Sequence, residues 1–166
     1  MDAILSRRSV RRYTPESVSQ ECVERLLAAG MAAPSAGDER PWHFVVIRDA
    51  TTRNCIPNIH PYAHMVSEAP VALLVCGDLN LQKHHGFWVQ DCAAATENVL
   101  VEAHHLGLGA VWLGVYPVPG RVEGLRRLLE VPEHVVPFAL VALGHPAEHK
   151  GPGERFDPTR IHHDRW

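Results

Sequence analysis

Four arginines and one serine near the start of the chain have the side chains and the spacing to bind a phosphate. The residues are Arg7, Arg8, Ser9, Arg11 and Arg12. A guanidinium group offers a planar fork of N–H donors that matches two phosphate oxygens at once. The same cluster is typical of a solvated basic arm, or of an arm that contacts nucleic acid. The motif alone therefore leaves three interpretations open.

A loop of small and polar residues between two prolines is a second candidate. It spans residues 33–41 and contains Pro34, Ser35, Ala36, Gly37 and Asp38. Small residues let a backbone approach a flat ligand closely, and a serine or an aspartate can hydrogen-bond to the edge of a ring. An ordinary polar loop that precedes a strand has the same composition, so this segment also has two interpretations.

The third candidate is the end of a strand expected near 110–115. The backbone N–H groups of Leu113 and Gly114 can point into a crevice at such an end, although a core strand that stops at a proline looks the same. Gly107 and Gly109 do not form a dinucleotide-binding fingerprint. They follow a helix and precede a strand, whereas the fingerprint follows a strand and opens a helix.

The 4 cysteines and 12 histidines lack the spacing of a metal site. Cys22, Cys55, Cys76 and Cys92 form no CxxC motif, and we expect them to be reduced thiols in a cytoplasmic protein. There is no HExxH motif, so we expect no metal and mostly surface histidines.

Length and composition predict one globular domain over residues 1–166. Hydrophobic residues make up 46% of the chain and charged residues 21%. The net charge of -3 argues against a general nucleic-acid or membrane-surface binder. The Arg-rich start lacks the apolar stretch of a secretory signal, and the acids Asp2 and Glu16 disfavour a transit peptide.

The elements that must position these candidates follow from hydrophobic periodicity and end signals. Helices are expected after a Ser17–Gln20 capping box as far as Gly30, over 87–106 and over 121–129. Buried strands are expected at 42–47, 71–76, 110–115 and 136–143, with a short helix and loops within 49–70. Residues 147–166 are expected to form an extended C-terminal tail.

Six segments, taken in order, resemble the small nitroreductase-like FMN-dependent oxidoreductases. They are SRRSVRRY, APSAGDERPWHFVVI, QDCAAATENVL, LGLGAVWLGVYP, VPFALVALGHP and ERFDPTRIHHDRW. The resemblance covers nearly the whole chain. It implies an α+β fold whose central mixed sheet of four to five strands is flanked by helices. It also implies an intertwined homodimer with two FMN molecules at the subunit interface.

The resemblance gives the basic residues cofactor-binding roles. Arg7, Arg8, Ser9 and Arg11 match the segment that holds the FMN phosphate and the pyrimidine side of the ring. Arg155 in the tail matches a second phosphate arginine.

The other two candidates match segments that contact the flavin ring. Pro34, Ser35, Ala36, Gly37 and Asp38 match a loop that the partner subunit lays against the isoalloxazine. Leu113 and Gly114 match a backbone segment that faces flavin N5. The family often has Asn-x-Gln before Pro-Trp, whereas this chain has Asp38-Glu39-Arg40. The roles of Asp38 and Arg40 therefore stay open.

The resemblance implies an FMN-dependent NAD(P)H oxidoreductase that transfers hydride through flavin N5 to a nitro compound, a quinone or a similar small acceptor. The flavin carries the chemistry and the protein orients and tunes it. We expect Arg11 to stabilise negative charge near N1 and O2 of the reduced ring. Three alternatives stay open: a dehalogenase or flavin-fragmenting relative, a flavin-storage protein, and a nucleic-acid binder with a basic arm.

The short chain favours a site that two subunits share. The helix expected over 87–106 contains Ala93, Ala94 and Ala95, which allow close helix packing. We expect this helix at the dimer interface with Trp88 anchoring one end, and the alternative is an ordinary core helix.

Overall fold

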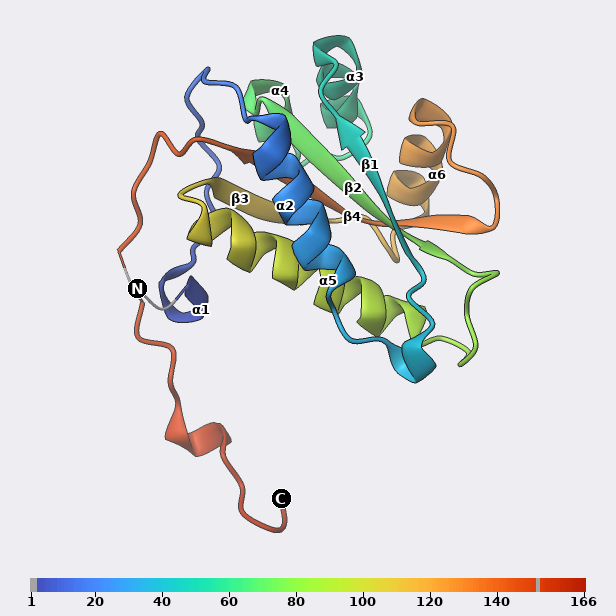
Figure 1. Cartoon of the computed structure of the whole chain (residues 1–166), viewed down its shortest axis with the longest axis vertical. Coiled ribbons are helices and arrows are strands. Elements are labelled where there is room, and N and C mark those ends of the chain that lie inside the picture. Colours follow the sequence, from blue (N-terminus) through green and yellow to red (C-terminus); the bar gives the residue numbers. More distant parts are fainter. Residues whose placement is uncertain (1–2, 152) are drawn as a thin grey trace.

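A four-stranded sheet forms the centre of the computed structural model, which describes residues 3–151 and 153–166 (Figure 1). The strands are β1 (Trp42–Ile47), β2 (Val71–Asp78), β3 (Gly109–Gly114) and β4 (Val135–Gly144), in the order β1-β2-β4-β3. All neighbouring strands pair antiparallel. The predicted α+β class is confirmed, while the parallel part of the expected mixed sheet amounts to one bridge between Ser9 and Ala110.

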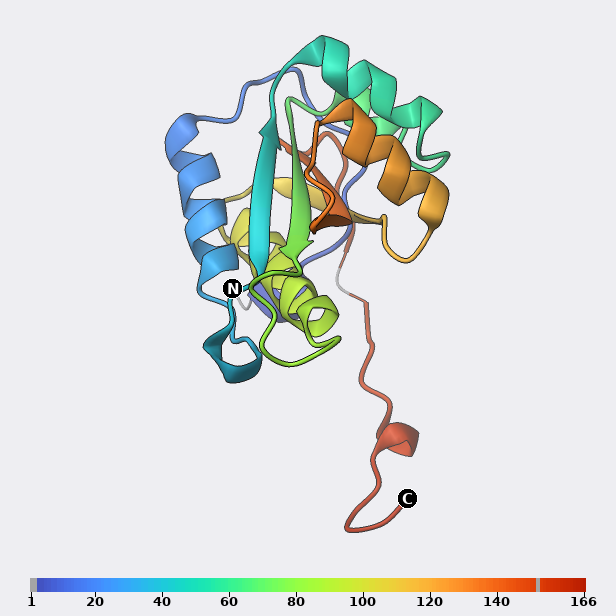
Figure 2. The same ribbon diagram turned by 90° about the vertical axis from the view of Figure 1, so that its right-hand side faces the viewer.

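Helices cover both faces of this sheet (Figures 1 and 2). One layer holds α2 (Gln20–Met31) and α5 (Trp88–His105), with the short α1 (Ala3–Ser6) beside α5. The other layer holds α3 (Ala50–Cys55), α4 (Met65–Glu68) and α6 (Pro119–Leu128). Three short 3-10 turns complete the list: η1 (Ala36–Asp38), η2 (Ile56–Asn58) and η3 (Pro158–Arg160).

The alternation of β2 explains why the sheet needs two helical layers. Its side chains point alternately to opposite faces, and every residue of this strand is buried. Leu73 packs in the core under α2 and α5, whereas Leu74 packs in the core under α3, α4 and α6. A central strand with two apolar faces is stable only when both are covered.

Three local predictions were wrong. The cap of α2 is Ser19, whose Oγ accepts from the Cys22 N–H at 3.1 Å, and not a box begun by Ser17. Gly30 does not end α2. It is buried where an added Cβ would lie 2.9 Å from the Phe44 ring, so the helix needs glycine for close packing. The strand at Trp42–Ile47 is an edge strand with partly exposed residues, because only β2 pairs with it.

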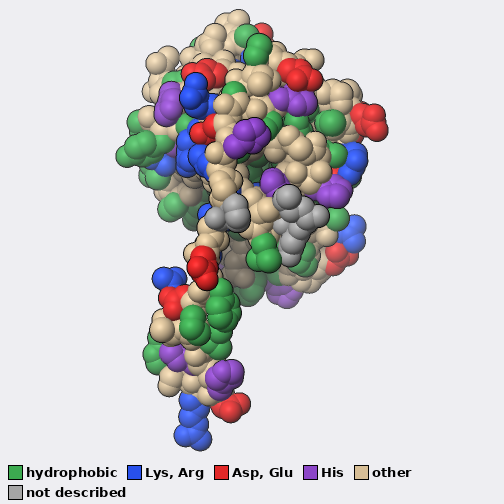
Figure 3. All heavy atoms as spheres, turned by 90° about the vertical axis from the view of Figure 1, so that its left-hand side faces the viewer, with side chains coloured by type: hydrophobic (Ala, Val, Ile, Leu, Met, Phe, Trp, Pro, Cys, Tyr) green, Lys and Arg blue, Asp and Glu red, His purple; other side chains and the backbone are tan. Residues whose placement is uncertain are grey.

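The first residues of the tail run beside the N-terminal segment. Tyr13 bridges to Pro146, and the Ala147 N–H donates to the Arg12 carbonyl at 2.9 Å. Beyond residue 153 the tail projects away from the body and carries exposed hydrophobic side chains (Figure 3). Phe156 is 77% exposed.

Candidate functional site

The predicted phosphate arginines are held by the fold and do not form a free arm. Arg7 Nε lies 3.2 Å from Glu97 Oε1 on α5, and the Arg7 side chain is only 19% exposed. The Arg8 guanidinium donates to backbone carbonyls, including those of Gly151 at 3.2 Å and Gly153 at 3.4 Å. The N-terminal segment and the tail are therefore tied together by Arg8.

The tail brings Arg155 to the same place. A Cβ added to Gly153 would lie 3.7 Å from Arg8 Nη2 and 3.9 Å from Arg155 Nε. The sequence separates these two arginines by most of the chain, yet both lie around one glycine. The structure thus brings together two of the residues predicted to hold a phosphate.

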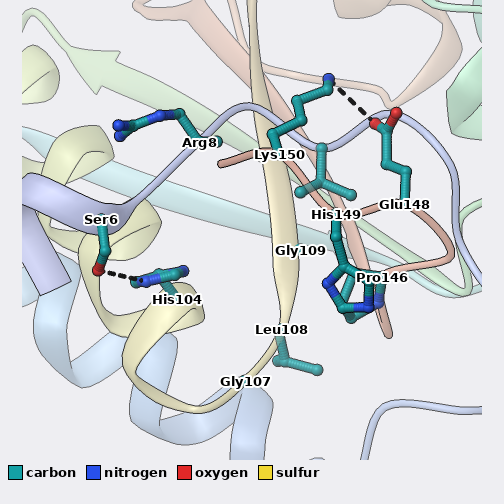
Figure 4. Close-up of a pocket in the computed structure, with 11 residues that line it drawn as sticks. Ser6, Arg8, His104, Gly107, Leu108, Gly109, Pro146, Glu148, His149 and Lys150 are labelled. Atoms are coloured by element: carbon teal, nitrogen blue, oxygen red, sulfur yellow. Dashed lines mark hydrogen bonds and ion pairs between the residues drawn. The ribbon is translucent and has the colours of Figure 1, made fainter. Parts of the chain in front are cut away.

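A cavity of about 220 Å³ lies beside Arg8, between the N-terminal segment, the end of α5 and the tail (Figure 4). On one side Ser6 Oγ and His104 Nε2 are hydrogen-bonded at 2.8 Å. On the other side Lys150 Nζ lies 3.1 Å from Glu148 and donates to the Ser9 carbonyl at 2.7 Å. The cavity lining thus contains two cationic side chains, Arg8 and Lys150, and one carboxylate, Glu148, which is a charge balance that suits an anion.

A second cavity of about 390 Å³ joins the other predicted residues. It is lined by Arg11, His60, Tyr62, His64, Met65, Trp112, Leu113, Gly114 and Arg121. Arg11 and the end of β3, which the resemblance assigns to one flavin ring, therefore line the same cavity. The lining contains two arginines and no carboxylate, so the cavity favours a group that acquires negative charge.

The backbone of Gly114 faces this cavity. Its carbonyl accepts from His60 Nε2 at 2.9 Å and from Arg121 Nη1 at 2.8 Å, so it points away from β4. The Ala110 carbonyl, four residues earlier, also points outward and accepts from the Val10 N–H. The N–H and C=O of one strand residue point to the same side. The Gly114 N–H therefore points toward the cavity edge, whereas the backbone of Leu113 faces β4.

Nothing in the described chain requires glycine at position 114. A Cβ added there would meet no atom within 4 Å, and its φ does not lie in the left-handed region. A glycine that neither packing nor conformation explains is typical of a backbone that a ligand approaches closely.

The loop after α2 is held by hydrogen bonds, and these include a partner for Asp38. Arg40 binds both Asp38 oxygens, at 2.6 Å and 2.8 Å, and this hydrogen bonding lowers the pKa of Asp38. Gly37 has a φ of 54°, and a Cβ on it would lie 2.6 Å from His84 Nε2. The departure from Asn-x-Gln thus produces an internal Asp38–Arg40 pair.

Two buried carboxyl groups anchor the same loop to α5. Glu39 Oε2 accepts from the N–H groups of Lys83 at 2.7 Å and His84 at 3.0 Å, and Asp91 Oδ1 accepts from Ala36 N–H at 3.0 Å. The remaining oxygens, Glu39 Oε1 and Asp91 Oδ2, are buried and receive no donor from the described residues. Each of the two carboxyl groups shifts the pKa of the other. Two ionised carboxylates would repel each other here, so we predict that the pair holds one proton.

The electrostatics agree with a proton on Asp91. Burial raises the pKa of Asp91, and the hydrogen bond from Ala36 only partly offsets this effect. Burial would also raise the pKa of Glu39, but the hydrogen bonds from His84, Lys83 and Asp91 outweigh it and lower that pKa.

The loop and the basic cavity lie at opposite ends of α5. Asp91 contacts the loop in the first turn, whereas His104 lines the basic cavity near the other end, about 20 Å away at 1.5 Å per residue. The loop residues Pro34, Ser35 and Ala36 line a separate cavity of about 340 Å³ beside α5. Within one chain, the described structure does not bring loop 34–38 to Arg8 or to the Arg11 cavity.

Two residues at these candidate sites were not singled out from the sequence. His60 is only 1% exposed and contacts Gly114, so it is an exception to the predicted, mostly surface histidines. Asp91 could have been found from the sequence, because it is a charged residue three positions after Trp88 on the apolar face of α5. Trp88, expected to anchor one end of α5 at a dimer interface, is 6% exposed and packs in its own chain against Phe138 and Tyr116. The place of α5 at that interface stays a prediction.

Other classes of site find little support. All four cysteines are free thiols. Within residues 3–151 and 153–166, no group of three or more histidine, cysteine or acidic side chains is arranged to hold a metal ion. In the same part of the chain, no helix has both the length and the apolar character to cross a membrane.

Known proteins resemble this chain along nearly its whole length. The profile of the Nitroreductase family matches residues 4–66 and 60–145. A protein of Methanothermobacter thermautotrophicus, named provisionally as an NADH dehydrogenase/NAD(P)H nitroreductase, is 54% identical over 166 residues. The alignment covers 100% of this chain and 87% of that relative.

Solved structures show the same fold. A Clostridium acetobutylicum protein, named provisionally as an NADH oxidase, has a TM-score of 0.97 at 39% identity, covering 99% of this chain and all of the other. A Desulfovibrio desulfuricans protein, named provisionally as a nitroreductase, was solved in complex with FMN. It has a TM-score of 0.85 at 35% identity, covering 99% of this chain and 95% of the other.

Proposed function

Because the chain belongs to the nitroreductase family, we propose that it is an FMN-dependent NAD(P)H oxidoreductase that reduces a small acceptor such as a nitro compound or a quinone. The observation that carries the proposal is the cavity where Arg11 meets the outward-facing backbone of Gly114. Bound FMN supplies hydride and electron chemistry that no side chain here provides.

The residues present fit this cofactor at both of its ends. Arg8 and Arg155 lie around Gly153, and Arg8 and Lys150 line the cationic cavity, so this region would hold the phosphate together with Arg7 and Ser9. Arg11 would place a permanent positive charge beside the pyrimidine side of the ring. The unexplained Gly114 offers a backbone N–H and room for a flat ring to approach.

We also propose that the working unit is a homodimer in which loop 34–38 of one subunit completes the site of the other. The loop lies away from the arginines of its own chain, and its conformation is fixed by the Glu39–Asp91 pair. The projecting tail exposes Phe156, Ile161 and Trp166, and a second copy would cover them. The four free thiols favour a cytoplasmic location.

The test is to purify the protein, add FMN if it is colourless, and titrate it with NADH or NADPH without oxygen. Yellow protein that bleaches, and that regains its colour on adding a quinone or a nitroarene, supports the proposal. Yellow protein that NAD(P)H does not bleach would favour the storage alternative. Protein that rejects FMN would refute the proposal, and salt-sensitive DNA binding would then favour the basic-arm alternative.

A further inference from the structure

We propose that His60 and Arg121 are positioning residues, which together hold the Gly114 backbone in the orientation that a bound flavin ring requires. This inference rests on the proposed function. It concerns the action of these groups on the protein backbone, which is separate from the positive charge that Arg121 adds to the same cavity.

Two side chains from distant segments donate to one carbonyl oxygen. His60 follows η2, Arg121 lies in the first turn of α6, and Gly114 is the last residue of β3. The distances to the Gly114 oxygen are 2.9 Å from His60 Nε2 and 2.8 Å from Arg121 Nη1. Because β3 is an edge strand, the described part of the chain pairs with its outer side at the Ser9–Ala110 bridge and places no neighbouring strand beside Gly114. The two donors supply the restraint that a neighbouring strand would give.

The histidine is fixed in one tautomer. His60 Nδ1 accepts from the Tyr62 N–H at 3.2 Å, so the ring proton must lie on Nε2, where it is donated to Gly114. The side chain is almost fully buried, and burial, together with the nearby Arg121 charge, lowers its pKa. A neutral, buried donor of this kind holds one geometry over the physiological pH range.

Tyr62 ties the two donors to one another. Its backbone orients His60, and its ring lies under the Arg121 guanidinium at 5.6 Å from the ring centroid. Cation–π contact of this kind limits the rotation of the arginine side chain. The three residues therefore form a closed bracket around the Gly114 carbonyl, which we call the Gly114 bracket.

The Gly114 bracket fixes the direction of the Gly114 N–H and does not change how strongly this group donates. The Gly114 N–H belongs to the preceding peptide unit, so donors to the Gly114 carbonyl do not polarise it. They hold the rotation of the strand end, and with it the direction in which the Gly114 N–H points. A flavin ring bound against this edge would lose alignment when either donor is removed.

The experiment compares His60→Ala, His60→Gln and Arg121→Ala with two controls, His105→Ala and Arg127→Ala. Both control side chains are exposed and lie outside the bracket. Three readouts are needed: the FMN dissociation constant, the absorption spectrum and two-electron potential of the bound flavin, and amide hydrogen exchange of residues 113–117 in the FMN-free protein.

We expect each alanine variant in the bracket to weaken FMN binding about threefold to tenfold, the value of one net hydrogen bond. The spectrum and potential should shift, and hydrogen exchange over 113–117 should speed up. His60→Gln should recover most of the loss, since its amide N–H can donate to the same carbonyl. Both controls should match the parent protein.

Unchanged FMN affinity, spectrum and exchange in Arg121→Ala would overturn the inference even if His60→Ala fails to fold. Faster exchange with unchanged affinity and spectrum would also overturn it, because the bracket would then be structural only. A parent protein that binds no FMN would overturn both the proposed function and this inference, whereas the other two outcomes leave the proposed function intact.

Discussion

The single proton predicted on the Glu39–Asp91 pair gives the sharpest test of the site's electrostatics. Replacing Asp91 with asparagine should leave the fold nearly as stable as before, within about 1 kcal/mol. The asparagine oxygen can still accept from the Ala36 N–H, and its NH₂ can donate to Glu39 Oε1. The asparagine amide thus provides a hydrogen-bond donor at every pH, whereas the acid pair provides one only when it binds a proton.

Replacing Asp91 with alanine should behave very differently. It leaves Glu39 Oε1 buried without any donor and leaves the Ala36 N–H without its acceptor. An unsatisfied buried polar group costs about 1–3 kcal/mol, so Asp91→Ala should lower the free energy of unfolding by about that much through Glu39. The unpaired N–H of the half-buried Ala36 should add a smaller loss. That is a large part of the typical stability of a domain.

The pH dependence of the stability gives a second test of whether Asp91 is protonated. Folding raises the pKa of Asp91, so it stabilises the protonated form. This contribution is fully present below the ordinary carboxyl pKa and is lost as the pH rises through the raised value. The backbone N–H groups of His84 and Lys83 donate to Glu39 and lower its pKa. These donors therefore favour a single negative charge on the pair rather than none.

The assay is urea unfolding of the parent, Asp91→Asn and Asp91→Ala from about pH 3, below the ordinary carboxyl pKa, to about pH 8, with the exposed carboxylate variant Glu21→Gln as control. The parent should lose stability more steeply than Asp91→Asn as the pH rises through the raised pKa of Asp91. Equal losses in the asparagine and alanine variants, or identical pH profiles for parent and asparagine, would refute a shared proton.

Three further predictions concern the flavin-facing side. Gly114→Ala should keep the melting temperature of the parent protein, because the added Cβ meets no atom of the described chain within 4 Å. It should bind FMN at least tenfold more weakly. Unchanged affinity would show that the glycine is not needed for a ligand to approach. Arg11→Ala should lower the two-electron potential of bound FMN by about 30 mV for each 1.4 kcal/mol of lost charge stabilisation, while the exposed neighbour Arg12→Ala leaves the potential unchanged in a redox titration. Because the pKa of His60 is lowered in the folded protein, its stabilising contribution is present above the ordinary histidine pKa and is lost as the pH falls through the lowered value. His60→Gln should therefore lose less thermal stability than the parent protein at acid pH. Equal pH profiles of the melting temperature would contradict the fixed tautomer.

The proposed dimer has its own measurement, sedimentation of the FMN-loaded protein. Removing residues 154–166, which carry the exposed Phe156 and Trp166, should shift the distribution toward monomer and weaken FMN binding, since Arg155 leaves with them. A stable, fully loaded monomer of the complete chain would show that one chain suffices for the site.

The sequence by itself predicted the strands of the sheet, and it singled out Arg8 and Arg11, which line the two basic cavities. Alternating or continuous apolar residues predict β2 and β4 well because both strands are buried on two faces. The 3-to-4-residue spacing of α5 predicts its length to within one residue at each end. These features depend on neighbours along the chain, so a local pattern is enough to show them.

Only the tertiary structure decided how the site is arranged. Glu39 and Asp91 are far apart in the chain, and the single proton predicted on the pair follows only from the tertiary packing that buries both carboxyl groups. His60 looks like any other histidine in the sequence, and its role arises because η2 and α6 meet at the end of β3. Burial and hydrogen-bond partners set the charge of a group and the direction of a backbone. Both are properties of contacts between distant segments, which no local pattern contains.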